Sequence, residues 1–192
     1  MKQNIELLVN KIIREAKISS SPINAERLAE SYFGLDFDCG KLNETELAGL
    51  KVTEKKIYIN ESRADELAAN IGLKNFTIAH ELGHWALHRD LTGEHTPQIE
   101  READKFATYL LMPENFVRAE FAKFNEHRLL EWLPTDMKVS SLADTFRVSY
   151  TAMKIRLSQW ELNLIYVDFK SGKCYLSKEE FLEITTGQIR LF

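Results

Sequence analysis

The order of apolar and polar residues along the chain predicts a fold that contains both helices and strands. Apolar side chains recur every three or four positions in residues 4–17 and 24–33, which predicts two short helices. The period then shortens to two, with Ile57 and Ile59 on one face of a strand and polar residues on the other. We expect strands over residues 35–38 and within 47–60, in a small, mainly antiparallel sheet.

Helical spacing returns in the second half of the chain. It predicts a helix over residues 75–88 that Asn75 can cap, helices over 99–111 and 114–133, and two shorter helices around a tight turn within 139–160. Alternation over residues 164–176 predicts a closing hairpin. We therefore expect an α+β core over residues 1–134, with residues 135–192 packed on it as a helix-turn-helix-like element and a hairpin.

Composition narrows the class of protein. The 192 residues are 44% hydrophobic and 28% charged, and the net charge is −4. This is a globular composition, and its acidic balance disfavours a protein that works mainly by attachment to nucleic acid or to an anionic membrane. Cys39 and Cys174 lack metal-ligand spacing, so we interpret them as two buried free thiols. With no long apolar run and no secretory leader, we expect a cytoplasmic protein that does not enter membranes.

Three of the five histidines lie close together, in the sequence HELGHWALH from His80 to His88. The first five residues form an HExxH motif, and on a helix His80 and His84 lie one turn apart, so both imidazoles can bind one zinc ion. Glu81 lies beside them, where it can act as general base toward a water molecule. Gly83, between the histidines, allows a neighbouring backbone to approach closely.

The HExxH motif alone does not establish a metal site. It also arises by chance in about one sequence in 70 of this composition. Histidines that are simply hydrogen-bonded on a helix face are therefore the alternative, and a third ligand is needed.

The segment IEREADKFA supplies candidates for that ligand. Spacing alone allows Glu100 or Glu102, but a helical wheel places Glu100 and Asp104 on the buried arc and Glu102 about 200° away, in solvent. Buried carboxylates require a cation or a polar partner. We therefore predict that Glu100 completes a His₂Glu zinc site and that Asp104 holds the second nitrogen of a ligating histidine.

Three ordered blocks, HELGHWALH, ExEADxFA and LLMP, resemble the ImmA/IrrE family of metallo-endopeptidases. The resemblance extends over about residues 20–160. It implies a minimal, gluzincin-like zincin core with an active-site helix, a glutamate helix and a small sheet whose edge can pair with an extended substrate. It also implies His80, His84 and Glu100 as zinc ligands, Glu81 as base and Asp104 as orienting partner.

The resemblance carries an expected function. Known members of the family cleave helix-turn-helix repressors and thereby release phage, mobile-element or stress genes. We therefore expect a zinc-dependent endopeptidase whose partner is such a repressor. The alternative is a regulatory module that holds a repressor or DNA without cutting, although the intact Glu81 argues against it.

Two features allow more than one interpretation. His88 lies one turn beyond His84, where it can contact the substrate carbonyl or the transition state, or can simply pack at the rim of the site. Residues 139–157 resemble a helix-turn-helix with a modest basic patch, which consists of Lys138, Arg147, Lys154 and Arg156. We favour a packing or substrate-docking role for this part over direct DNA binding. His95 and His127 are expected at the surface.

Overall fold

The computed structural model describes residues 4–90, 96–126 and 132–186. By its internal contacts the chain divides into two compact units. The first comprises the residues up to Pro113 together with Phe146–Val148, and the second comprises Glu114–Thr145 and the residues from Ser149 onward. The first break thus falls after Pro113, whereas the expected domain boundary lay at residue 134.

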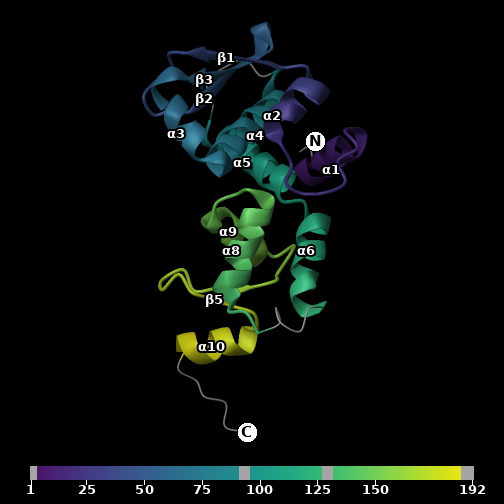
Figure 1. Ribbon diagram of the computed structural model, residues 1–192, viewed down its shortest axis with the longest axis vertical. Helices are drawn as coiled ribbons and strands as arrows, with labels where there is room; N and C mark the ends of the chain where they lie inside the picture. Colours follow the sequence, from purple (N-terminus) through teal and green to yellow (C-terminus); the bar gives the residue numbers. More distant parts are fainter. Residues whose placement is uncertain (1–3, 91–95, 127–131, 187–192) are drawn as a thin grey trace. The chain divides into compact units, whose positions relative to one another are not determined.

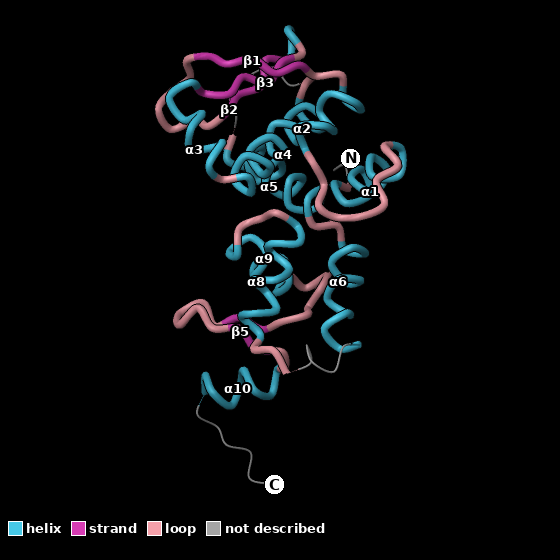
Figure 2. Tube along the Cα trace, in the orientation of Figure 1, coloured by secondary structure: helices cyan, strands magenta, loops and turns pink. Residues whose placement is uncertain are grey.

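The first unit is a small sheet combined with helices (Figures 1 and 2). Its helices are α1 (Ile5–Glu15), α2 (Ala25–Leu28), which continues into a π-helical turn (Ala29–Phe33), α3 (Ala64–Ala69), α4 (Ile71–His88) and α5 (Pro97–Leu111). Asn4 caps α1 and Asn24 caps α2 through their side chains. Helix α4 packs closely on α5, while α1 packs on α5 and α2 on α4. The core of the unit lies between these helices, around Ile78, Leu82, Phe106 and Leu110.

The sheet has the strand order β1 (Asp36–Gly40), β3 (Lys56–Asn60), β2 (Ala48–Lys51). β2 pairs with β3 in the antiparallel sense, but β1 pairs with β3 in parallel. The sheet is therefore mixed, and the prediction of a mainly antiparallel sheet was wrong for one of its two strand pairs. β2 lies between β1 and β3 in sequence but at the far edge of the sheet, so β3 is the central strand and pairs with both. Cys39 on β1 is exposed, so the prediction that it is buried was also wrong.

The second unit contains α6 (Glu114–Glu126), α8 (Thr135–Phe146), α9 (Tyr150–Ser158) and α10 (Lys178–Thr186). The predicted closing hairpin is present as β4 (Tyr166–Val167) paired antiparallel with β5 (Cys174–Tyr175). The turn between α8 and α9 has a left-handed backbone at Arg147, a conformation that favours glycine. Ser149 caps α9 by accepting a hydrogen bond from the Ala152 amide.

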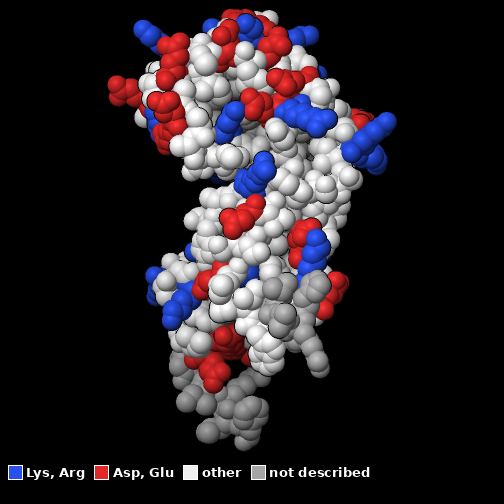
Figure 3. Space-filling model, in the orientation of Figure 1, with Lys and Arg blue, Asp and Glu red and all other residues white. Residues whose placement is uncertain are grey.

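The fold as a whole is α+β and mostly helical. Among the described residues, no helix is long and apolar enough to cross a membrane. On the face seen in Figure 3, acidic and basic side chains are interspersed over the surface.

Candidate metal centre

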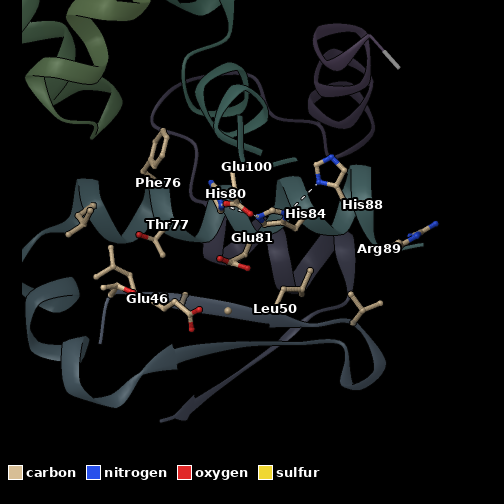
Figure 4. Close-up of a pocket in the computed structure, with 16 residues that line it drawn as sticks. Glu46, Leu50, Phe76, Thr77, His80, Glu81, His84, His88, Arg89 and Glu100 are labelled. Atoms are coloured by element: carbon tan, nitrogen blue, oxygen red, sulfur yellow. Dashed lines mark hydrogen bonds and ion pairs between the residues drawn. The ribbon is translucent and has the colours of Figure 1, made fainter. Parts of the chain in front are cut away.

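Helix α4 carries the HExxH motif and begins earlier than predicted. Asn70 caps it by accepting a hydrogen bond from the Leu73 amide, at 2.9 Å. Asn75, the predicted cap, lies inside the helix, where its side chain accepts from the Ala25 amide and donates to the Ile23 carbonyl. The buried side chains of Ile78 and Leu82 pack one face of the helix into the core. His80, His84 and His88 consequently follow one another along the opposite stripe (Figure 4).

Gly83 allows α5 to approach this helix closely. A Cβ atom at Gly83 would lie 2.9 Å from the Ala103 Cα and 3.0 Å from the Ala103 carbonyl oxygen. Backbone atoms at that distance exclude every residue larger than glycine unless the helices separate. The predicted close approach is therefore confirmed, and the segment that approaches is the helix that carries Glu100.

The close packing brings His80, His84 and Glu100 together, with one donor atom of each lying within 4.8 Å of the others. The Nε2 atoms of His80 and His84 are 2.9 Å apart. The Glu100 carboxylate lies 3.2 Å from Nε2 of His80 and 3.6 Å from Nε2 of His84. These separations bracket the roughly 3.3 Å expected between two ligands of one tetrahedral zinc with bonds of about 2.0–2.1 Å.

The chemistry of the three donors also fits zinc. Two imidazoles and one carboxylate form a His₂Glu set, which leaves a fourth position for water or substrate. The Nδ1 atom of His80 lies 2.8 Å from Oδ1 of Asp104. A proton on Nδ1 leaves the lone pair of Nε2 directed at the other two donors. Asp104 thus contacts one of the two histidines of the motif, and that histidine is His80.

The expected burial of the carboxylates was wrong. The side chain of Asp104 is 56% exposed and that of Glu100 is 43% exposed. Both lie on the flank of α5 that opens to solvent, because Ala103 and Phe106 occupy the face against α4. The observation that marks these two carboxylates as candidate partners of a metal centre is therefore their position beside the histidines, and not their burial.

Glu81 differs from these carboxylates because it is buried. Burial raises its pKa to about 7, the nearby Glu100 carboxylate contributes to the rise, and His80 and a hydrogen bond from the Leu50 backbone oppose it. In Figure 4 its carboxylate points toward β2, below the histidine pair. A carboxylate with a pKa near neutrality can both accept and return a proton at physiological pH.

His88 is almost fully buried, with 5% of its side chain exposed. Its Nδ1 atom lies 3.4 Å from Nδ1 of His84 and its Nε2 atom 3.1 Å from the Glu102 carboxylate. Both ring nitrogens therefore already have protein partners, which favours packing over contact with a substrate. Glu102 was expected to face solvent, and its side chain is 35% exposed, but it is also bonded to His88 and Gln98, which the sequence did not predict.

A groove runs between β2 and the histidine-bearing face of α4 (Figure 4). Its volume is about 670 Å³, and its lining includes Leu47, Gly49 and Leu50 from the β2 region and all three histidines from α4. β2 lies at an edge of the sheet, so its outer backbone groups are not used by β3. Such an edge can pair with an extended peptide.

The basic patch expected in residues 138–156 is not a surface patch. Lys138 is 2% exposed and Arg156 is 1% exposed, and Arg156 donates to the Gln159 side chain at 2.6 Å. Two of the four basic side chains therefore belong to the interior of the second unit. The remaining two histidines, His95 and His127, lie outside the described residues.

Comparison with known proteins gives a family match and several solved structures of similar fold. The profile of the Peptidase_M78 family, described as the IrrE N-terminal-like domain, matches residues 45–158, more than half of the chain. A solved structure of a Mycobacterium tuberculosis transcriptional regulator is similar in fold, with a TM-score of 0.57 and 16% identity over 89% of this chain. The chain spans 53% of that regulator, about half of its length. No curated protein matches the sequence significantly.

Proposed function

The chain belongs to the ImmA/IrrE family, Peptidase_M78, and from this membership we propose that it is a zinc-dependent endopeptidase with a zincin-like core. The convergence of His80, His84 and Glu100 on one point, with Glu81 beside them, carries the proposal. A zinc ion held by these three side chains would act as a Lewis acid that lowers the pKa of water.

The protein's own groups supply the remaining steps. The outer edge of β2 binds an extended substrate along the groove, which brings a peptide carbonyl to the histidine pair. Glu81 accepts a proton as a water oxygen bonds to the carbonyl carbon, and then delivers that proton to the amide nitrogen as the C–N bond breaks. Asp104 keeps the proton of His80 on Nδ1, so that Nε2 remains a ligand.

We further propose that the substrate is a helix-turn-helix transcriptional repressor in the cytoplasm. The resemblance to repressor-cleaving proteases supports this substrate class, and one solved structure of similar fold is that of a transcriptional regulator. In this proposal residues 1–134 carry the chemistry and residues 135–192 select the substrate. Direct DNA binding has little support, because Lys138 and Arg156 are buried.

The test is to incubate the zinc-loaded protein with purified helix-turn-helix repressors from the same organism and to analyse the products by mass spectrometry. We expect cleavage at a defined bond, loss of cleavage with a chelator and recovery when zinc is restored. An intact repressor that forms a stable complex with the zinc-loaded protein would instead favour the non-cleaving binding module.

A further inference from the structure

We propose that His88 and Glu102 form a hydrogen-bonded relay that positions His84 for metal binding. This inference rests on the proposed function, because the relay matters only if Nε2 of His84 is a ligand. His88 would then be a positioning residue, acting through His84 and not through the substrate.

The proton positions of the two rings are mutually consistent with this role. If Nε2 of His84 binds a metal, the one proton of the neutral ring is on Nδ1. That N–H can donate to Nδ1 of His88, at 3.4 Å, since His88 then carries its own proton on Nε2. Nε2 of His88 in turn donates to the Glu102 carboxylate, at 3.1 Å. One arrangement of protons therefore satisfies His84, His88 and Glu102 together, with both histidines neutral and the glutamate ionised.

The far end of the relay is also held. Glu102 accepts a second hydrogen bond from the Gln98 side chain, 2.9 Å away and one turn earlier on α5. The relay thus joins the end of α4 to the first turns of α5, on elements that Gly83 and Ala103 bring into close contact. Rotation of the His84 ring would break the contact with His88, so the relay restricts the direction of Nε2.

The two ligating histidines are held in different surroundings. His80 is held by Asp104, whose side chain is 56% exposed, so water can replace that carboxylate. His84 is held by His88, whose side chain is only 5% exposed, so little water can take its place. Hydrogen bonds are stronger, and their loss is more costly, where water is excluded. We therefore expect the contact of His88 with His84 to contribute more to zinc affinity than the contact of Asp104 with His80.

The test compares zinc affinity, measured by competition with a chromophoric chelator, in the wild type, four single variants and one double variant. His88→Phe keeps the ring volume but removes the acceptor, and His88→Asn keeps an acceptor near the position of Nδ1 while losing the link to Glu102. Asp104→Ala removes the exposed contact with His80. Arg101→Ala, at an exposed position of the same helix, is the matched control. Melting of the metal-free proteins and the imidazole ¹⁵N–¹H spectrum of the zinc-loaded proteins are recorded in parallel.

We expect His88→Phe to weaken zinc binding about 10- to 100-fold, the range typical of groups that orient metal ligands. His88→Asn should lie between His88→Phe and the wild type, Asp104→Ala should lose less than His88→Phe, and Arg101→Ala should match the wild type. An exchange-protected Nδ1 proton of His84 should be present in the wild type and absent from His88→Phe. Adding Glu102→Ala to His88→Phe should cause no further loss, because Glu102 acts through His88.

Three results would overturn the relay. The first is wild-type zinc affinity in His88→Phe, and the second is a loss of metal-free stability with unchanged affinity, which would make His88 purely structural. The third is equal loss in His88→Phe and His88→Asn together with an unchanged His84 proton signal. If the wild type itself takes up no zinc, the proposed function fails first, and this outcome is distinct from the other three.

Discussion

Replacing Gly83 by alanine tests whether the α4–α5 contact builds the metal centre. The added Cβ would lie 2.9 Å from the Ala103 Cα, whereas carbon atoms in ordinary contact are about 3.5 Å apart, so α5 must move by about 0.6 Å. Such overpacking costs about 1–3 kcal/mol. The better helix propensity of alanine offsets about 1 kcal/mol of it, which leaves a net loss of about 1 kcal/mol.

The displacement acts on zinc binding through Glu100. A ligand must stay within about 0.5 Å of its productive position, so a shift of α5 by about 0.6 Å should weaken zinc binding at least about tenfold. Thermal melting of the metal-free protein and competition with a chelator measure the two effects. Gly49→Ala is the matched control, because a methyl group there meets only the Leu42 side chain, at an ordinary 3.5 Å. If Gly83→Ala raised stability by about 1 kcal/mol and left zinc affinity unchanged, helix propensity alone would explain it and the packing argument would be refuted.

Three further expectations concern individual side chains. Glu100→Ala should abolish stoichiometric zinc binding, whereas Glu102→Ala should retain zinc with lower affinity, as metal analysis and chelator competition will show; equal zinc affinity in the two variants would contradict the assignment of ligands. In the metal-free protein the pKa of Glu81 is raised, so between about pH 4.5 and 7 the folded state retains a proton that the unfolded state has released. The free energy of unfolding therefore falls as pH rises through this window. Glu81→Gln should lack this dependence and be more stable than the wild type by about 3 kcal/mol at pH 8, as measured by urea unfolding. If the stability of the two proteins changed with pH in the same way, burial of Glu81 would not be the cause of the dependence. Arg156→Ala should destabilise the second unit by about 2–4 kcal/mol in the same assay, and a change within about 0.5 kcal/mol would mean that its burial is not energetically important.

The sequence was most informative where the chemistry is local. The spacing of His80 and His84 on one helix is fixed by the helical repeat, so their proximity followed from residue numbers alone. The helical wheel likewise placed Glu100 and Asp104 on one side of α5, and the structure brings both beside the histidines. The prediction that Gly83 meets a neighbouring backbone was confirmed, although the sequence could not show which one.

Features that depend on how helices pack were harder to predict from the sequence. The wheel describes one helix, but the face of α5 that α4 covers is decided by Ala103 and Phe106, and this leaves Asp104 exposed. The contact of Glu102 with His88 joins residues 14 positions apart and carries no short-range signal. Strand order has the same limitation, because neither strand's own pattern specifies that β1 pairs with β3 in parallel.

The burial of the basic residues in the second unit was missed for a related reason. Lys138 and Arg156 occupy helix positions whose polarity indicates a surface, yet the structure places both in the interior. A long basic side chain can lie along apolar neighbours while its charged end reaches a polar group, as Arg156 reaches Gln159. Two short helices that were not predicted, α3 and α10, have six and nine residues and offer little periodicity to detect.

The metal content and repressor cleavage of Glu81→Gln, measured on one preparation, test the central claim most directly. Because Glu81 is not among the three converging donors, the variant should retain one zinc per chain, the content that we expect of the wild type. Because the amide of glutamine cannot accept the proton of water, it should lose cleavage almost completely. Cleavage at the wild-type rate by the zinc-loaded variant would contradict the assignment of Glu81 as the base, and loss of zinc would contradict the assignment of the ligands.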